Sequence, residues 1–344
     1  MSARPPQFHV TADLIALTIT DGVLQVAVVQ RKSDLACIDI ERNGIVQEIR
    51  RDSEHHWALP GGHVNVNEND IDHAAVRELR EETGIEVDVK SLVQVGTYGK
   101  LGRDPRSGRT VSVAYLAFQP RIANPEAGSD AKQAKIISVL ELLAEPNRLE
   151  FDHETMLIDA IQRVRDMVIT TPVATNFCAP EFTLSELREV YEVLWHRAYD
   201  KEISHRERQR YASEIREYTS DNYFQLLSSM RVYERITHGM PLLKFELASM
   251  SNRALEEKIS KIVINDARRQ APKNPAIRER LDPANFARKV VGIPDFIEEV
   301  PQSEKRSSLT GTGRPAQLYR RGPAERLDPP LRLRVKKDRP RDAR

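Results

Sequence analysis

Three glutamates on one side of a short charged stretch have the spacing of a cation-binding face. Glu78, Glu81 and Glu82 stand at positions i, i+3 and i+4, so they share one face of a helix. Like charges repel one another and resist burial, so a positive group should balance them. Arg77 and Arg80 are one candidate. A divalent cation is the other, because carboxylate oxygens are natural ligands of Mg²⁺ and Mn²⁺. A solvated helix held by ion pairs is the simpler alternative.

The residues around these glutamates predict a helix over residues 70–83. Its apolar residues share an arc beside the glutamate face; they are Ile71, Ala75, Val76 and Leu79. Gly84 follows at once, and glycine suits the left-handed residue that ends many helices. The segment "HHWALPGGHV" at 55–64 predicts a strand and a turn before the helix. The glutamates are therefore expected on a rigid helix behind a glycine-rich turn.

This pattern resembles the Nudix box, which reads Gly, five residues, Glu, seven residues, then Arg-Glu-apolar-x-Glu-Glu-x-Gly-apolar. Its second half is complete in "RELREETGI", residues 77–85. The resemblance implies that helix glutamates hold Mg²⁺ or Mn²⁺ on the diphosphate of a nucleoside diphosphate derivative, and serve catalysis if the domain is active. These metal and catalytic candidates are Glu78, Glu81 and Glu82. The ligand-binding candidates of the same stretch are Gly61, Gly62 and Arg77.

One spacing departs from the box. Five residues separate Gly62 from Glu68 as expected, but eight rather than seven separate Glu68 from Arg77. Counting seven residues back from Arg77 arrives at Asn69. Either the loop bulges by one residue or the first glutamate of the box is lost, which would put hydrolysis in doubt. The glutamates of the helix are unaffected by the extra residue.

Four further residues suit a nucleotide ligand. Arg103 and Arg106, in "RDPR", could pair with a diphosphate or with ribose hydroxyls. Trp57 and Tyr98 could stack on adenine. A structural turn with surface charge is an alternative for the arginines, and ordinary packing is the simpler one for the aromatic residues.

The first 168 residues alternate strands with two helices, which predicts a sandwich of the α+β class. Asp21-Gly22 is a strong two-residue turn signal, so residues 8–31 are expected to form a hairpin. A second helix is expected from "FDH" at 151–153 to about Val168. An extended hairpin or loop is expected in residues 33–54, and strands in 85–99 and 110–120.

A short helix near the C-terminal end has an apolar and a polar face. Asp282 suits its N-cap and Gly292 its stop. The predicted inward residues are Pro283, Phe286, Ala287 and Val290, and the predicted outward residues are Asn285, Arg288 and Lys289. Arginine and asparagine suit base edges in the major groove, and lysine suits phosphate. A solvated helix with surface cations is the alternative.

Charge and neighbouring elements favour nucleic acid as the partner of this end. Residues 281–344 contain 15 Lys+Arg and 9 Asp+Glu, a net charge of +6, although the whole chain has only +1. Thr183 and Glu186 predict a capping box that starts an upstream helix. Two predicted strands flank "TGTGRPA", so that Arg314 and Arg320 would belong to a basic wing that contacts DNA.

Five further segments resemble the Nudix-related transcriptional regulators of NAD metabolism, the NrtR group: "GRDPRSGRTVSVAYLAF", "FDH", "FTLSELREVYE", "LDPANFARKV" and "GTGRPAQLY". The resemblance implies a Nudix α/β/α sandwich with a mixed sheet, followed by a winged helix-turn-helix that carries a helical insertion. It implies a homodimer that senses ADP-ribose or a related molecule and binds a palindromic operator in double-stranded DNA. The expected parts are a Nudix-like domain (1–168), a linker and first helix (169–199), the insertion (200–280), the recognition helix and wing (281–330) and a basic disordered tail (331–344).

Other functions stay open at this point. An active Nudix hydrolase that splits ADP-ribose is the rival interpretation, and both activities could coexist. An interaction scaffold built on residues 200–280 is a third possibility, and a sugar-utilisation operon is an alternative to NAD metabolism. Cys37 and Cys178 support neither a disulfide framework nor a zinc site. No apolar run reaches the length of a membrane span and no signal peptide is visible, so a cytoplasmic protein is expected.

Overall fold

The computed structural model describes most of the chain outside residues 196–280. The described residues are 8–31, 37–42, 45–50, 56–104, 109–122, 125–128, 131–144, 148–195, 281–301, 316–331 and 333. The chain forms two compact units, residues 1–196 with 277–344, and residues 197–276. The second unit, and with it the predicted insertion at 200–280, lies outside the described residues.

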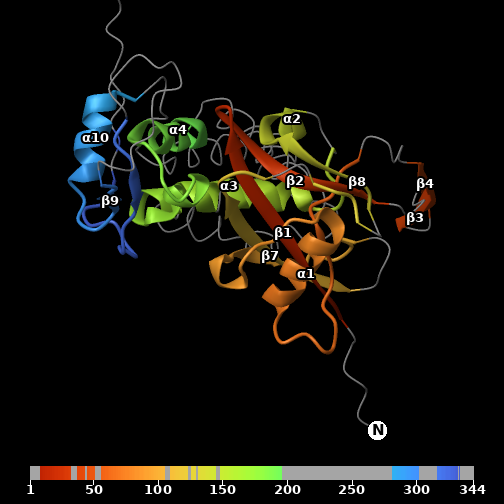
Figure 1. Ribbon diagram of the computed structural model, residues 1–344. Coiled ribbons are helices and arrows are strands. Elements are labelled where there is room, and N and C mark those ends of the chain that lie inside the picture. Colours follow the sequence, from red (N-terminus) through yellow and green to blue (C-terminus); the bar gives the residue numbers. More distant parts are fainter. Residues whose placement is uncertain are drawn as a thin grey trace, which may run out of the picture. The chain divides into compact units, whose positions relative to one another are not determined.

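A six-stranded mixed sheet is the centre of the N-terminal part (Figure 1). Its strand order is β6-β7-β1-β2-β8, and β5 pairs with β1. The long strand β1 runs parallel to β7 and antiparallel to β2 and β5. The strands are β1 (His9–Thr20), β2 (Val23–Arg31), β5 (Gly61–His63), β6 (Val93–Tyr98), β7 (Thr110–Gln119) and β8 (Ala131–Ser138). The mixed sheet confirms the α+β prediction.

The predicted hairpin of residues 8–31 is present, and the segment 33–54, expected as an extended hairpin or a loop, contains a hairpin. The strand predicted over 85–99 is shorter than expected. β1 and β2 are joined at Asp21 and Gly22, whose φ angles of 52° and 71° suit a two-residue hairpin turn. β3 (Cys37–Arg42) pairs with β4 (Ile45–Arg50). The strand expected over 85–99 starts only at Val93, because Asp88 accepts from the Lys90 amide and caps a short 3-10 helix, η2 (Val89–Ser91).

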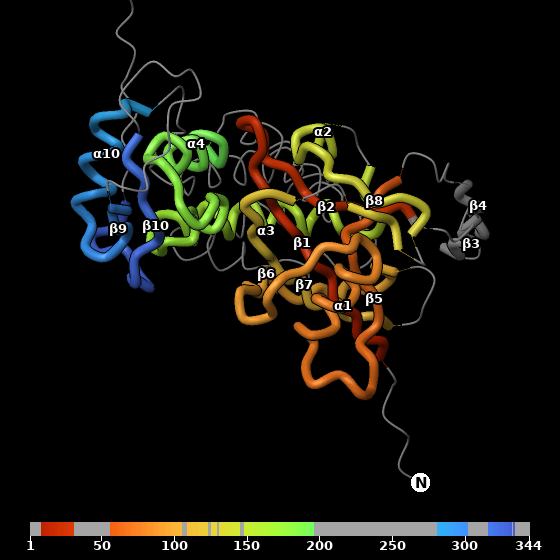
Figure 2. The backbone as a smooth tube through the Cα atoms, in the orientation of Figure 1, coloured from red at the N-terminus to blue at the C-terminus, as the bar shows by residue number. Residues whose placement is uncertain are grey.

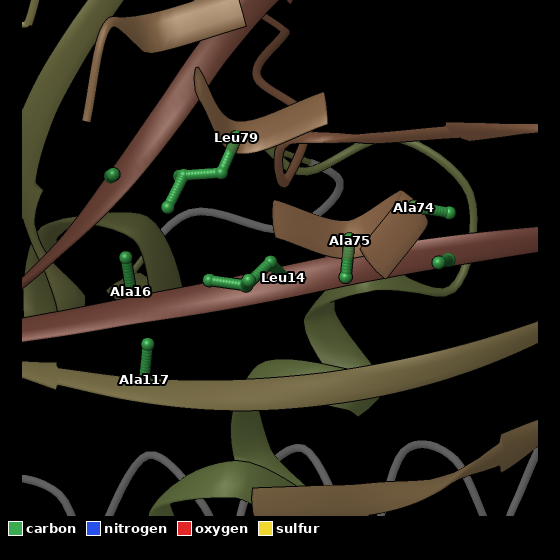
Figure 3. Packing of buried hydrophobic residues seen from close by; sticks show 8 residues of the cluster. Leu14, Ala16, Ala74, Ala75, Leu79 and Ala117 are labelled. Atoms are coloured by element: carbon green, nitrogen blue, oxygen red, sulfur yellow. The ribbon is translucent and has the colours of Figure 1, made fainter. Parts of the chain in front are cut away.

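The Nudix-box helix α1 (Ile71–Thr83) packs closely on β1 through small side chains (Figure 3). Ala74, Ala75 and Leu79 of α1 are fully buried. They meet β1 through Ala12, Leu14 and Ala16. The buried arc includes Ala74 in place of the predicted Val76, which is only half-buried. Gly84 ends the helix with a φ of 70°, as predicted.

A second, longer helix covers the opposite face of the sheet, which completes the predicted sandwich. Side chains alternate across a strand, so Asp13 points away from the face that Ala12 and Leu14 turn to α1. There it meets His153, the first residue of α3 (His153–Thr170). The buried side chains of α3 recur at helical spacing, including Met156, Leu157, Ile161 and Val164. A short helix α2 (Val139–Ala144) follows β8.

In the part of the chain that the structure describes, the C-terminal module contains a 3-10 helix, two α-helices and a small hairpin (Figure 2). Its elements are η3 (Pro172–Phe177), α4 (Leu184–Leu194), α10 (Pro283–Val291), β9 (Ile297–Glu299) and β10 (Tyr319–Arg321). The capping box of Thr183 and Glu186 starts α4, and Asp282 caps α10, as predicted. Strands β9 and β10 pair antiparallel, which confirms the predicted hairpin. Tyr191 and Phe286 join the helices with ring centroids 5.6 Å apart.

The chain remains packed beyond the boundary predicted for a disordered tail. Leu331 is 2% exposed and its amide donates to the Ile169 carbonyl at 2.9 Å. Leu333 is also buried. The predicted tail of 331–344 therefore begins too early, and the prediction stands only for residues 334–344, which lie outside the described residues. Within the described residues, no helix has the length and apolar character needed to cross a membrane.

Candidate functional site

Arg77 is the centre of the charged cluster that the Nudix box predicts. Its Nε donates to Glu68 Oε1 at 2.6 Å. Its Nη1 donates to Glu78 Oε1 at 2.7 Å and to Glu81 Oε2 at 2.9 Å. Its Nη2 donates to the His63 carbonyl at 3.0 Å. One guanidinium therefore joins three carboxylates to the end of β5 and offsets part of their charge, while Arg80 is exposed.

The extra residue in the box is absorbed by a bulge of the loop. Glu68 reaches Arg77 despite the longer spacing, and its second carboxylate oxygen accepts from the Asn65 amide at 2.6 Å. Glu68 is thus the carboxylate of the loop that Arg77 binds. Of the two outcomes left open by the sequence, the structure supports the bulge.

Close packing explains why Gly61 and Gly62 precede the helix. A Cβ atom on Gly62 would overlap the Glu78 carboxylate. A Cβ atom on Gly61 would overlap the Asp13 carboxylate and lie 2.7 Å from the Ala12 carbonyl oxygen. The Gly61 amide also donates to Glu82 Oε2 at 3.0 Å. These contacts account for both glycines without a ligand, so a ligand contact at either remains a prediction.

The carboxylates around Arg77 differ in their electrostatics. Burial raises the pKa of Glu78, although Arg77 opposes this effect. The hydrogen bond from Arg77 lowers the pKa of Glu68. The pKa of Arg77 itself is raised, mainly by Glu68, so it stays cationic. Glu78 is the carboxylate whose charged form burial disfavours most clearly, and an additional cation would favour that form.

The predicted metal ligands have suitable chemistry, but they do not form a ready site. Glu82 is buried and bound to the Gly61 amide, whereas Glu78 and Glu81 face Arg77. Among the residues that the structure describes, no three acidic, histidine or cysteine side chains are placed to hold a metal ion together. The arrangement therefore does not fit a three-glutamate metal site as it stands, and Mg²⁺ or Mn²⁺ binding remains a prediction.

Arg103 belongs to a second cluster, which is buried. Its Nε and Nη2 donate to Asp152 at 3.0 and 2.6 Å, which makes a bidentate ion pair. Its Nη2 also lies 3.8 Å from Asp13 Oδ2. The side chain is 5% exposed, so the guanidinium is not open to solution as a surface turn would leave it. Arg106 lies outside the described residues.

His153 and Ser112 complete this second cluster around Asp13. The Ser112 hydroxyl donates to Asp13 Oδ2. His153 Nδ1 accepts from the Leu59 amide at 2.9 Å, so its proton lies on Nε2, which is 3.5 Å from Asp13 Oδ1. Asp13, His153 and Ser112 are buried, and sequence reasoning assigned none of them to a site. The available signal was an aspartate inside the apolar run "TADLIALTIT".

Both predicted adenine-stacking residues have partners within the protein. Trp57 is 6% exposed, and Lys135 Nζ lies over its ring, 5.3 Å from the centroid. The Tyr98 hydroxyl donates to Asp159 Oδ2 at 2.9 Å. These contacts favour the packing interpretation for both rings, and stacking on a base remains untested.

The predicted recognition helix α10 has the expected division of faces. Phe286 is 2% exposed and Val290 is fully buried, whereas Arg288 is exposed. Asn285 and Lys289 are half-buried, and Asn285 Oδ1 accepts from Arg288 Nη2 at 3.0 Å. On the hairpin, Arg320 is exposed and lies 3.5 Å from Glu181. Of the residues predicted to face inward, Pro283 is exposed and Ala287 is only half-buried, and Arg314 lies outside the described residues.

Helix α3 joins the second cluster to the C-terminal module. The last four carbonyls of a helix lack partners within it, and here each finds one outside. Thr171 donates to Met167, Tyr191 to Val168, Leu331 to Ile169 and Leu327 to Thr170, at 2.7 to 3.0 Å. Arg165 Nε also donates to the Leu194 carbonyl at 2.6 Å. The end of α3 is thereby fixed to α4 and to the segment that follows β10.

Comparisons with known proteins identify relatives of the N-terminal domain and of a longer part of the chain. Residues 20–159 match the family model of the NUDIX domain. The repressor "ADPR responsive transcriptional repressor NtrR" of Acinetobacter baylyi is 28% identical over 190 residues, 55% of this chain and 67% of that protein. An "ADP-ribose pyrophosphatase" of Methanocaldococcus jannaschii is 39% identical over 103 residues, 30% of this chain and 56% of that enzyme.

A solved structure extends the likeness in fold over both modules. The crystal structure of Shewanella oneidensis NrtR covers 94% of this chain and 99% of its own, with a TM-score of 0.51 and 20% identity.

Proposed function

We propose that this chain, a Nudix-related regulator of the NrtR type, binds DNA through its C-terminal module and responds to ADP-ribose or a related nucleoside diphosphate derivative. Its Nudix domain would bind the ligand, and the protein would act in the cytoplasm, as a homodimer on a palindromic operator. The observation that carries the proposal is the orientation of α10. Phe286 and Val290 anchor this helix inside the module, while Arg288 faces outward.

That orientation is the one a groove-reading helix needs. A helix-turn-helix docks one face on its domain and inserts the other into the major groove. Arg288 suits the guanine edge and Asn285 the adenine edge, while Lys289 suits phosphate. The hydrogen bond between Asn285 and Arg288 holds the two base-reading candidates side by side. Arg320 adds a cation on the neighbouring hairpin.

A gel-shift titration tests the DNA part. The probe is the DNA fragment upstream of the protein's own operon, and ADP-ribose is varied. Arg288→Ala should weaken binding about 5- to 150-fold, since one base contact contributes about 1–3 kcal/mol. Arg163→Ala, which removes an equally exposed arginine from α3, is the matched control. Equal losses for the two variants would refute a reading role for α10.

Salt dependence and ligand response complete the test. A protein that neutralises Z phosphates loses affinity with a slope of about −0.9Z in log K against log salt. A flat salt response would remove the DNA proposal. ADP-ribose should shift the binding midpoint, because a ligand with different affinities for two states must change their balance.

Hydrolysis is the second candidate function, and the retained Glu68 contact favours keeping it open. For a divalent cation to support this chemistry, Glu78, Glu81 and Glu82 would first have to leave their present contacts with Arg77 and the Gly61 amide. Within the chain, Arg77 would orient the carboxylates of Glu68, Glu78 and Glu81. Incubation with ADP-ribose and Mg²⁺ or Mn²⁺ should release AMP at more than about one turnover per second if the domain is an ordinary enzyme. Glu82→Gln should abolish that release.

A further inference from the structure

Two aspartates on one face of α3 hold the segment between β6 and β7. Asp159 accepts from the Tyr98 hydroxyl at 2.9 Å. Asp152, seven residues earlier and hence about two helical turns away, accepts two hydrogen bonds from Arg103. The segment from Tyr98 to Arg103 is therefore attached to the N-terminal half of α3 at two points.

The start of α3 lacks a side-chain cap and follows a residue in an unfavourable backbone conformation. Asp152 stands at the N-cap, where an aspartate normally accepts from an amide of the first turn, yet its side chain makes no capping bond. The preceding residue, Phe151, has a φ of 54°, a left-handed conformation that bulky residues rarely adopt. The Asp152 carboxylate thus has an alternative set of partners nearby, the amides of Glu154 and Thr155.

Arg103 also has an alternative partner close at hand. It lies beside Asp13, whose carboxylate abuts Gly61, and the Gly61 amide binds Glu82 of the Nudix helix. Contacts through Asp13 and Gly61 thus connect the guanidinium with Glu82 of the Nudix helix, although Asp13 lies on the sheet face opposite that helix. Arginine binds diphosphate oxygens with the same two-bonded geometry that it uses for a carboxylate. Gly102, with a φ of 74° and open space around it, lets the segment turn.

We propose that Asp152 is a positioning residue which passes the state of the Nudix domain to the C-terminal module. Without ligand, Asp152 holds Arg103. When the diphosphate of a ligand takes Arg103, the freed Asp152 caps α3 and the start of the helix rearranges. This inference rests on the proposed function, because it specifies how ligand binding changes DNA affinity.

Helix α3 can transmit such a change because both of its ends are engaged. Its first turn carries Asp152 and His153, which contact Arg103 and Asp13. The carbonyls of its last turn accept hydrogen bonds from α4 and from the 327–331 segment. A shift of the first turn along this continuous 18-residue helix would therefore move the attachment of the C-terminal module.

Substitution of Asp152 in the full-length protein tests the relay, with ADP-ribose as the ligand. Asparagine still caps a helix well but cannot hold Arg103 as an ion pair. Asp152→Asn should therefore resemble the ligand-bound state. We expect its Kd for ADP-ribose, measured by calorimetry, to fall about threefold or more, since Arg103 is already released. The ADP-ribose-induced shift of the gel-shift midpoint should shrink towards onefold.

Asp166→Asn is the matched control, because Asp166 is an exposed aspartate of the same helix. It should leave both the Kd and the shift at their wild-type values within about twofold. If Asp152→Asn also keeps both wild-type values, the relay is wrong while the proposed function survives. If the wild type itself shows no ADP-ribose-dependent shift, the proposed function fails and the relay fails with it.

Hydrogen exchange of the wild-type protein gives a readout that needs no variant. Capping by Asp152 should slow amide exchange at Glu154 and Thr155 when ADP-ribose is bound. Exchange in strand β2, near Val28, serves as an internal reference for general stabilisation. Unchanged protection of the first turn at saturating ADP-ribose would overturn the proposal.

Discussion

Arg77 and Arg103 each gather carboxylates, but they do so in different surroundings. The Arg77 side chain is 22% exposed, and its partners come from its own helix and from the adjoining loop. The Arg103 side chain is 5% exposed, and its partners Asp13 and Asp152 belong to the central strand and to α3. The first cluster is local and solvent-screened. The second is assembled by the tertiary fold; Arg103 and Asp13 have little access to water, whereas the Asp152 side chain is 24% exposed.

The largest effect is expected where charge is most buried. Arg103→Ala would leave Asp13 and Asp152 without their cation, which typically costs about 3–5 kcal/mol in a buried pair. Urea unfolding followed by circular dichroism measures this loss. A cost below about 1 kcal/mol would mean that solvent reaches the cluster and that the contrast with Arg77 is false.

Gly61→Ala should disturb both clusters at once. The added Cβ would overlap the Asp13 carboxylate and press on the Ala12 carbonyl, so β5 must shift from β1. Overpacking of this kind costs about 1–3 kcal/mol. Gly84→Ala, at a glycine with open space around it, separates steric overlap from the strain of a left-handed residue. Equal melting temperatures for Gly61→Ala and the wild type would show that the contact relaxes without cost.

Arg77→Ala should cost less than Arg103→Ala. Its hydrogen bonds to charged groups would contribute about 1–2 kcal/mol, the lower part of the usual range, because solvent screens the cluster. The same urea titration measures it, repeated at 1 M salt, where the Debye length is about 3 Å. Salt should reduce the Arg77 contribution more than the Arg103 contribution. A larger effect of salt on the Arg103 contribution would show that the Arg103 cluster is the more solvent-screened of the two.

The smallest effect concerns the pH response of the Arg77 cluster. Arg77 lowers the pKa of Glu68, so the stability from ionised Glu68 is complete above its ordinary value of 4.5 and is lost as pH falls through the lowered value. The difference in melting temperature between wild type and Glu68→Gln should therefore shrink below pH 4.5.

Glu78→Gln should show the opposite sign. Burial raises the pKa of Glu78, so the folded state binds a proton more readily than the unfolded state. Wild type should gain stability relative to this variant as pH falls through the raised value towards 4.5. Parallel pH profiles for the two variants would contradict the assignment of burial as the dominant cause at Glu78.

Sequence spacing was sufficient to predict the contacts around Arg77, but it was insufficient to predict those around Arg103. The i, i+3, i+4 pattern and the Nudix resemblance placed Arg77 with its glutamates, although only the structure decided between Glu68 and Asn69. Caps and turns were equally readable, as at Thr183 and Asp21-Gly22. These features depend on contacts within a few residues, which a periodic pattern encodes.

The partners of Arg103 could not be read from a periodic pattern. Asp152 is 49 residues away in sequence, and the contact exists only because α3 crosses the sheet beside β6. An arginine near a turn is usually a surface residue, so the sequence favoured either a ligand or solvent. The packing of Leu331 was missed for a similar reason, since its partner Ile169 belongs to a distant helix end.

The hydrogen bond from the Leu281 amide to Glu192 Oε1, 2.6 Å long, has a consequence for the segment between α4 and α10. It ties the end of α4 to the start of α10, although more than eighty residues separate them in sequence. With both ends held at one point, a longer or shorter intervening segment changes the closure entropy only slightly, by about 0.6 kcal/mol for each doubling of length. The pairing of α4 and α10 is therefore expected to tolerate changes in the length of the segment between them.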